Sequence, residues 1–236
     1  MIAEWLMAFA RPLGFVALFP LFTFLSLGIV LRLALAAALA WPLIGVVGEA
    51  AILLILKEFF VGALLGAALG IPIWAAQVAG SAIDVFRGTA QPAVAGTDPS
   101  AEVPVTAVLF PLTLLAVFVA AGGVRAAVAV IYASYDAWPM ATIAPTGFAL
   151  AAFTADLLAQ LLSLAVAMGL PLLAAMAAGE AALAIATRSG RQIGLVDLGL
   201  SIKGLAFLLI LPGYLLLLAR YAEPTLFAVP SFRGAG

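Results

Sequence analysis

Long apolar blocks alternate with short polar stretches along this chain, and the lengths of the blocks predict its helices. A helix needs about 20 apolar residues, within a range of about 17–25, to cross the hydrocarbon core of a bilayer. Backbone in lipid must satisfy its own hydrogen bonds, so the pattern predicts an all-α polytopic membrane protein. The apolar blocks are residues 12–31, 33–56, 59–83, 103–124, 126–138, 147–187 and 204–219.

Several blocks are irregular. Trp41-Pro42 interrupts the second block, and 126–138 is too short for an ordinary span. Pro171 lies inside the longest block and predicts a kink there. At the N-terminus, the acidic Glu4 precedes any basic residue, which fits a cleaved secretory signal poorly. We therefore expect the first segment to be a retained membrane helix.

The charges of the polar stretches bear on orientation. The stretch 188–203 carries Arg188, Arg191 and Lys203 against a single aspartate, and such an excess of positive charge favours the cytoplasmic side. The stretch 84–102 carries one arginine against three acidic residues. Three apolar segments lie between these two loops, which are therefore expected on opposite sides of the membrane.

Composition agrees with a membrane protein and argues against several kinds of chemistry. The 236 residues are 67% hydrophobic and 9% charged, with a mean hydropathy of +1.29, whereas a soluble domain is about 25% charged. A net charge of −1 argues against nucleic acid as a partner, because no basic patch meets phosphate. There is no cysteine and no histidine, which removes thiol nucleophiles, imidazole bases and the commonest zinc ligands. We expect no enzymatic activity, no cofactor and no metal site.

Glycines recur every four residues in EFFVGALLGAALGIP, at Gly62, Gly66 and Gly70. This spacing places them on one helix face, where a neighbouring helix can approach closely. The pattern is typical of ordinary helix packing, and it also fits an interface in a many-helix assembly.

Three acidic residues, Glu58, Asp156 and Glu180, lie within or beside apolar blocks. An ionisable group in a membrane is costly and usually faces protein or water. Two interpretations are open: structural ion pairs, for instance with Lys57 or Arg188, and a proton relay in a carrier.

The stretch GSAIDVFRGTAQPAVAGTDPSAEVP, residues 80–104, differs from the apolar blocks on either side. It contains four charged residues, three prolines and three glycines. It is either a solvated connector or a loop that lines a water-filled cavity, where non-helical backbone is tolerated at membrane depth.

The segment EFFVGALLGAALGIPIWAAQVAGSAIDVFRG resembles the signature of the FliR/SctT family, the export-gate subunits of type III secretion systems. The likeness continues, in the family's order, through DPSAEVP, GG at 122–123, YASYDAWP and LSIKG. The Asp84-x-x-Arg87-Gly88 and YASYDAWP segments resemble the virulence (injectisome) branch more than the flagellar one. The chain departs from the family at RSGRQIGLVDL, where members commonly carry an Arg-x-Ala-Pro-Gln-like stretch.

The resemblance implies a multi-pass protein of the bacterial inner membrane, built of bent helical hairpins. One copy of it joins two other small hydrophobic membrane subunits, each in several copies, in a hetero-oligomeric cone. Cytoplasmic export and ATPase modules and exported unfolded proteins are the further partners implied. The polar loop is expected to point into the channel and help plug it.

The site residues implied fall into three groups. The pore-plug candidates are Val94, Ala95, Gly96, Thr97, Asp98, Pro99, Ser100 and Glu102. The residues of helix packing and assembly are Gly62, Gly66, Gly70, Asp84, Arg87 and Gly88. The cytoplasmic-side contact candidates are Arg188, Arg191 and Lys203.

We expect one membrane domain over residues 1–236. Its parts are N-terminal hairpins over 1–83, the polar plug-candidate loop 84–104, and C-terminal helices over 105–236 that include the polar loop 188–203. The predicted function is a component of the type III secretion export gate, forming part of the inner-membrane channel for unfolded proteins.

The alternative is a small-solute secondary transporter that works alone. Its helices would be broken at Pro72 and Pro171, around Glu180.

Overall fold

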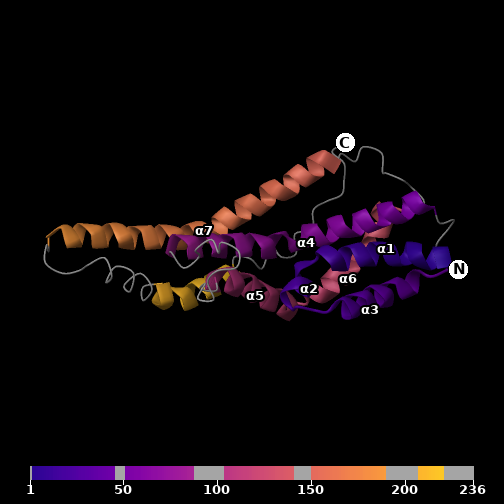
Figure 1. Ribbon diagram of the computed structural model, residues 1–236, viewed down its shortest axis with the longest axis horizontal. Coiled ribbons are helices and arrows are strands. Elements are labelled where there is room, and N and C mark those ends of the chain that lie inside the picture. The colour runs from indigo at the N-terminus through magenta and orange to yellow at the C-terminus, as the bar shows by residue number, and fades with distance from the viewer. Residues whose placement is uncertain (1, 46–50, 88–103, 141–149, 190–206, 221–236) are drawn as a thin grey trace, which may run out of the picture. The chain divides into compact units, whose positions relative to one another are not determined.

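Every element of the described part of the chain is helical (Figure 1), which confirms the predicted all-α class. The computed structural model describes residues 2–45, 51–87, 104–140, 150–189 and 207–220. The elements are α1 (Ile2–Leu18), α2 (Pro20–Phe24), α3 (Ile29–Ala40), the 3₁₀ helix η1 (Trp41–Leu43), α4 (Ile52–Arg87), α5 (Val105–Ala120), α6 (Gly123–Ala137) and α7 (Leu150–Ser189). A further helix, unlabelled in Figure 1, covers Phe207–Arg220.

The chain folds into two compact units, which we call unit 1 and unit 2. Unit 1 comprises Met1–Ile71, Phe118–Gln160 and Pro224–Gly236, and unit 2 comprises Pro72–Val117 and Leu161–Glu223. Each unit therefore combines segments from both sides of the polar loop, and α4, α5 and α7 contribute residues to both units. The expectation of one membrane domain stays a prediction.

The predicted single span over 12–31 is wrong, because the helix is broken there. Pro20 begins α2, and the residue before a proline is pushed out of the α region. Phe19 accordingly is extended, with ψ 121°. After α2 the chain turns through Ser26, whose φ of 52° is left-handed.

Arg32 stabilises this break from the first turn of α3. Its Nε donates to the Leu27 carbonyl oxygen at 2.9 Å, and its Nη2 donates to the Phe22 carbonyl oxygen at 2.8 Å. Carbonyls at a helix end have no partner within the helix. The guanidinium gives the Leu27 carbonyl a donor and adds a second donor to the Phe22 carbonyl, which also accepts from the Leu27 N–H. These bonds help a broken helix to be tolerated in an apolar segment.

The helix α4 is longer than the block 59–83 that predicts it. Its last turn includes Asp84 and Arg87, so the polar loop does not begin at residue 84 as expected from the sequence. Pro72 and Pro171 lie inside α4 and α7, and both helices continue through their proline. The prediction that the helices of a carrier are broken at these prolines is therefore wrong.

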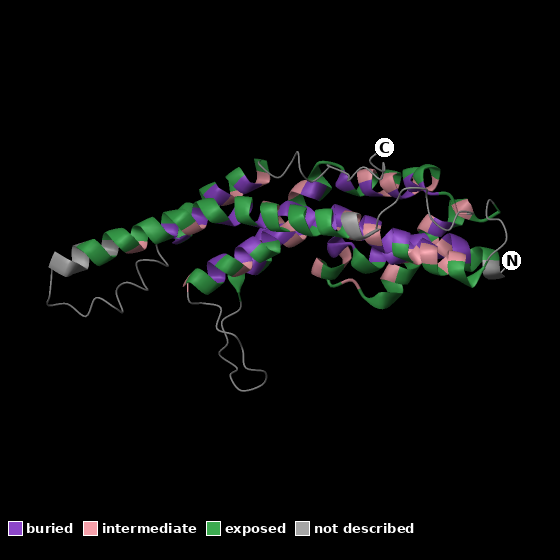
Figure 2. Cartoon of the chain, turned by 90° about the horizontal axis from the view of Figure 1, so that it is seen from above, coloured by how far each residue is buried: buried purple, intermediate pink, exposed green. Residues whose placement is uncertain are grey.

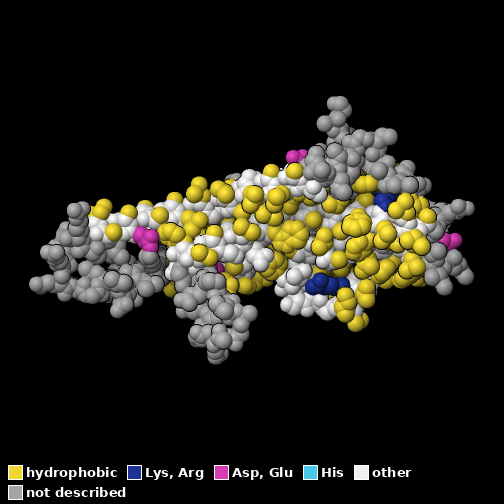
Figure 3. Space-filling model, turned by 45° about the horizontal axis from the view of Figure 1, so that its top comes forward, with side chains coloured by type: hydrophobic (Ala, Val, Ile, Leu, Met, Phe, Trp, Pro, Cys, Tyr) yellow, Lys and Arg dark blue, Asp and Glu magenta, His cyan; other side chains and the backbone are white. Residues whose placement is uncertain are grey.

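Two of the described helices, α4 and part of α7 (Phe153–Ala182), are long and apolar enough to cross a membrane. A third span results if α5 and α6 are taken together, since they form a pair bent by 77° at a short break. The break lies at Gly122, whose φ of 81° favours glycine. Buried and exposed residues share the same helices (Figure 2), and hydrophobic side chains cover much of the described surface in Figure 3.

Candidate functional site: two buried charge clusters

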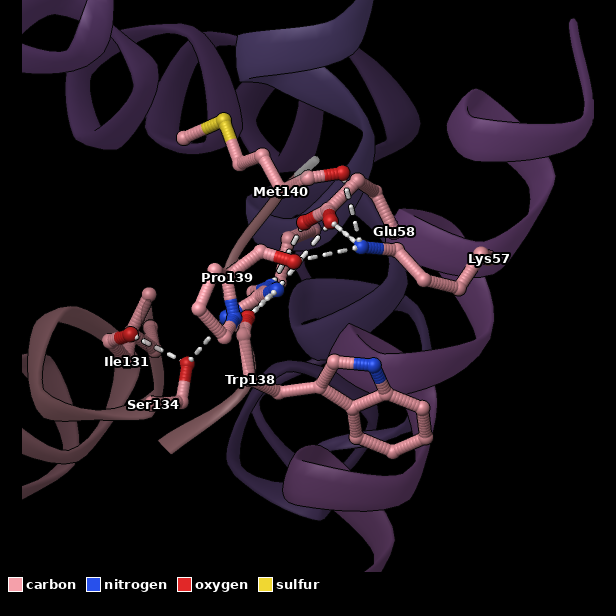
Figure 4. A network of polar contacts seen from close by, with 8 residues as sticks. Lys57, Glu58, Ile131, Ser134, Trp138, Pro139 and Met140 are labelled. Atoms are coloured by element: carbon pink, nitrogen blue, oxygen red, sulfur yellow. Dashed lines mark hydrogen bonds and ion pairs between the residues drawn. The ribbon is translucent and has the colours of Figure 1, made fainter. Parts of the chain in front are cut away.

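Unit 1 encloses a charge cluster, the α6-end cluster, formed by Arg11, Lys57, Glu58, Ser134 and Trp138. Figure 4 labels all of them except Arg11. Arg11 from α1 and Glu58 from α4 are both fully buried. The Arg11 Nε lies 2.6 Å from Glu58 Oε2, and Nη2 lies 3.1 Å from Oε1. A bidentate pair of this kind fixes the geometry of both groups as well as neutralising their charges. It supplies the close pairing that a buried ion pair needs to offset its desolvation.

The Arg11 guanidinium also contacts α6 and the residue that follows it. Nη1 donates to Ser134 Oγ at 2.8 Å, and Nη2 donates to the Trp138 carbonyl oxygen at 2.7 Å. Its central carbon lies 3.9 Å from the centroid of the Tyr135 ring, a cation–π contact. One arginine therefore joins three helices of unit 1.

Lys57 extends the cluster along the backbone beyond α6. Its Nζ donates to the carbonyl oxygens of Pro139 and Met140, each at 3.1 Å, and forms an ion pair with Glu58 (Figure 4). Two cations thus hold the three consecutive carbonyls of residues 138–140. Cations at the C-terminal end of a helix complement its dipole, so the cluster fixes the path of the chain as it leaves α6.

Glycines bring α1 and α4 together beside this cluster. A Cβ on Gly62 would meet the Arg11 carbonyl oxygen, and a Cβ on Gly66 would lie 2.6 Å from the Phe15 carbonyl oxygen. From the other side, a Cβ on Gly14 of α1 would collide with the α4 backbone. The glycine face of α4 therefore packs against α1 of the same chain, and its role in assembly stays a prediction.

Unit 2 holds a second cluster, the α5-start cluster, formed by Asp84, Arg87, Ala107 and Phe207. Asp84 is fully buried, and its Oδ2 accepts from the backbone N–H of Ala107 at 2.9 Å. Ala107 lies in the first turn of α5, where backbone N–H groups have no partner within the helix. A carboxylate there also complements the positive end of the helix dipole.

Arg87 completes the α5-start cluster. Its Nη1 lies 3.5 Å from Asp84 Oδ1, and its guanidinium carbon lies 4.0 Å from the centroid of the Phe207 ring. One helical turn earlier, a Cβ on Gly80 would collide with the Thr106 backbone. Residues 80, 84 and 87 lie on one face of α4, because side chains three and four positions apart are neighbours on a helix.

The structure brings some predicted residues together and leaves others apart. The pairing of Glu58 with Lys57 is confirmed, and Arg11 is a stronger partner that sequence reasoning missed. Asp156 is exposed on α7, and Glu180 is half-buried on the same helix. Arg188 lies in the last turn of α7, and its side chain is not described.

Gly70 is buried on α4, and the other remaining predicted positions lie outside the described residues. They are Val94, Ala95, Gly96, Thr97, Asp98, Pro99, Ser100 and Glu102 of the plug candidate, together with Gly88, Arg191 and Lys203. Within the described residues, no group of three acidic, histidine or cysteine side chains could hold a metal ion.

Fold and clusters together define a polytopic helical membrane protein whose charges serve helix packing. A family described as "Bacterial export proteins, family 1" matches residues 2–227. The chain is 30% identical over 206 residues to the "Yop proteins translocation protein T" of Yersinia pestis, covering 86% of this chain and 79% of the relative. It is 25% identical over 224 residues to the "Secretion system apparatus protein SsaT" of Salmonella typhimurium, covering 88% and 86% respectively.

The chain therefore belongs to family 1 of the bacterial export proteins. This confirms the resemblance to the FliR/SctT family, and the two relatives favour the virulence branch. It is a component of a type III secretion export apparatus, associated with other components of that apparatus, and the small-solute transporter is not favoured.

Proposed function

We propose that this chain forms part of an inner-membrane channel for unfolded proteins and works there without enzymatic activity. The observation that carries the proposal is that the apolar helix α3 is too short to cross a bilayer. The 12-residue α3 is about 18 Å long. The hydrocarbon core of a bilayer is about 30 Å thick.

Both α3 and the last described helix expose large apolar side chains. On α3, Ile29 is 69% exposed and Val30 is 78% exposed, and on the last described helix Leu209 is 75% exposed. Large exposed apolar surface usually marks contact with lipid or with another protein. Because α3 is too short to span lipid alone, we propose that two other small hydrophobic subunits of the apparatus cover these exposed surfaces.

The polar segment between α4 and α5 contributes the proposed plug. Its candidates run from Val94 to Glu102, and the support comes from the sequence alone: small uncharged residues are followed by Asp98-Pro99. Proline fixes its own φ and stiffens the backbone. Cytoplasmic export and ATPase modules would supply the energy, since no P-loop sequence occurs in this chain.

Purification of the tagged chain from membranes of a secreting bacterium tests the proposed assembly. We expect two other hydrophobic proteins to co-purify in unequal stoichiometry. As the control, the same preparation from cells that lack both proteins should yield little stable chain. A chain that is stable alone or as a small homo-oligomer, and that moves a small solute in vesicles, would contradict the proposal.

A loop variant tests the plug. We would delete Val94–Gly96 and replace Asp98-Pro99 with Gly-Ser in the assembled complex. The segment has few large apolar groups, each worth only about 1.5–3 kcal/mol when buried, so assembly should persist. Leakage of small ions or dyes across the inner membrane is expected. The matched control is Gln91→Ala, which changes the same segment outside the plug candidates. Ion leakage no greater than that of the parent in the deletion variant would count against the plug.

A further inference from the structure

We propose that Asp84 is a positioning residue that holds the start of α5 against the end of α4 and so fixes both ends of the polar segment 88–103. The carboxylate accepts from the N–H of Ala107, 23 residues further along the chain. The inference rests on the proposed function, because that segment carries the plug candidates.

The covalent connection alone leaves the two ends free to separate. Fully extended, the segment 88–103 reaches about 55 Å. The separation of the two helix ends is therefore set by contacts outside the segment. Two such contacts are described, the backbone approach at Gly80 and the hydrogen bond of Asp84.

The approach at Gly80 is steric, and it is not directional. A glycine allows two backbones to meet closely, but the contact has no donor or acceptor that selects one register. The bond from Asp84 to Ala107 is directional and charge-assisted, and such bonds are about twice as strong as neutral ones. Asp84 therefore selects the register of α5 along α4.

Burial makes this choice of register costly to change. An ionised carboxylate that loses its partners in an apolar environment is strongly destabilised. If α5 slid by one turn, the fully buried Asp84 would lose the N–H of Ala107, and the pair with Arg87, at 3.5 Å, is longer than that bond. The proposed role of Asp84 is thus to fix the start of α5 on the end of α4, next to the two ends of the segment 88–103.

The test uses three variants in the assembled complex. Asp84→Ala removes the acceptor, Asp84→Asn keeps an acceptor of the same shape without charge, and Asp136→Ala removes an exposed carboxylate from α6 as the matched control. Three quantities are measured: the amount of assembled complex on a native gel, ion leakage across the membrane, and hydrogen–deuterium exchange of Thr106–Val108.

For Asp84→Ala we expect assembly within about twofold of the parent, increased ion leakage, and exchange faster by about tenfold or more, because a bond to a charged acceptor is lost. Asp84→Asn should show ion leakage and hydrogen–deuterium exchange of Thr106–Val108 close to those of the parent. Asp136→Ala should match the parent in all three measurements.

Two results would overturn the inference. One is that the Asp84→Ala complex assembles and shows the same ion leakage and the same hydrogen–deuterium exchange as the parent. The other combines two observations: Asp84→Ala fails to assemble, and Asp84→Asn assembles but exchanges Thr106–Val108 as fast as an unprotected segment. Asp84 would then be needed for folding without setting the register of α5.

The loop variant separates failure of this inference from failure of the proposed function. If the Val94–Gly96 deletion increases ion leakage and Asp84→Ala does not, the positioning role of Asp84 is wrong and the plug assignment stands. If neither variant leaks, the plug is wrong, and exchange at Thr106–Val108 alone decides whether Asp84 pins α5.

Discussion

In the two charge clusters, side chains of opposite charge contact opposite ends of helices. In the α6-end cluster of unit 1, Arg11 and Lys57 hold carbonyls that follow the C-terminus of α6. In the α5-start cluster of unit 2, Asp84 holds an N–H in the first turn of α5. Each charge has the sign that the helix dipole favours at that end. The same electrostatic rule thus explains charged side chains at two places in an apolar chain.

The clusters differ in how firmly their ion pairs are held. Arg11 and Glu58 are fully buried and separated by 2.6 Å. The Arg87 side chain is 16% exposed, and it lies 3.5 Å from Asp84. Close, buried pairing is costly to disturb, whereas partly exposed pairs contribute little. We therefore expect the α6-end cluster to govern folding of unit 1, and the α5-start cluster to govern the placement of α5.

Glu58→Ala is expected to have the largest effect on this comparison. The change leaves the buried Arg11 without its carboxylate partner and removes the ion pair of Lys57, and breaking a buried pair in this way costs about 3–5 kcal/mol. The amount of assembled complex in membranes should fall to background. Normal assembly would show that the cluster is dispensable for folding.

A double variant sharpens this prediction. Replacing both Arg11 and Glu58 with methionine removes the paired charges together, and such replacements are often close to neutral. The double variant should therefore assemble better than Glu58→Ala alone. Ser134 and the Trp138 carbonyl lose a donor in the double variant, so full recovery is not expected.

The sequence predicted the helices well where apolar blocks are long and unbroken. The blocks 59–83, 103–124 and 147–187 correspond to α4, α5 and α7. The block 12–31 failed, because a proline and a left-handed serine break the helix inside a run of uniform hydropathy. The pattern of apolar residues does not register such breaks.

The partners of the charged residues were harder to predict. Lys57 and Glu58 are adjacent, so their pairing was an open possibility in the sequence. Arg11 is 47 residues from Glu58, and Ser134 is 123 residues from Arg11. These contacts follow from how the helices pack, which spacing along the chain does not reveal. Pro139 of the YASYDAWP segment was a signal, since proline ends a helix and carbonyls at a helix end need donors from outside the helix.

Gly66→Leu is expected to have the second-largest effect. A Cβ at this position would lie 2.6 Å from the Phe15 carbonyl oxygen, so a leucine must push α1 away from α4. Overpacking of this kind costs about 1–3 kcal/mol or more, and the displacement would also strain the pair of Arg11 with Glu58. Little complex should appear on a native gel. Gly179→Ala is the matched control, because nothing lies within 4 Å of a Cβ there.

Arg87→Ala should have a smaller effect, confined to unit 2. It removes the ion pair with Asp84, which is long at 3.5 Å, and the contact with the Phe207 ring. Cation–π contacts contribute about 0.5–2 kcal/mol. The thermal stability of the purified complex should fall slightly, with assembly retained. Arg87→Lys should recover only part of the loss, since lysine lacks the planar guanidinium that stacks on a ring. An effect as large as that of Glu58→Ala would show that the two clusters are equally firm.

The smallest effect is expected from Gly169→Ala in unit 2, compared with Gly66→Ala in unit 1. A Cβ on Gly169 would lie 3.4 Å from the Ala79 Cβ, which is an ordinary van der Waals contact. Alanine also favours a helix over glycine by about 0.5–1 kcal/mol. Gly169→Ala should therefore leave the thermal stability of the complex unchanged or slightly raised.

The same substitution at Gly66 should lower stability, because its methyl group would lie 2.6 Å from a backbone oxygen. Backbone on both helices must shift to admit it, whereas at Gly169 the nearest atom already lies at contact distance. Comparing the two melting temperatures isolates helix packing from charge, since neither position carries a polar side chain. Equal losses at both positions would mean that α7 approaches α4 as tightly in unit 2 as α1 approaches α4 in unit 1.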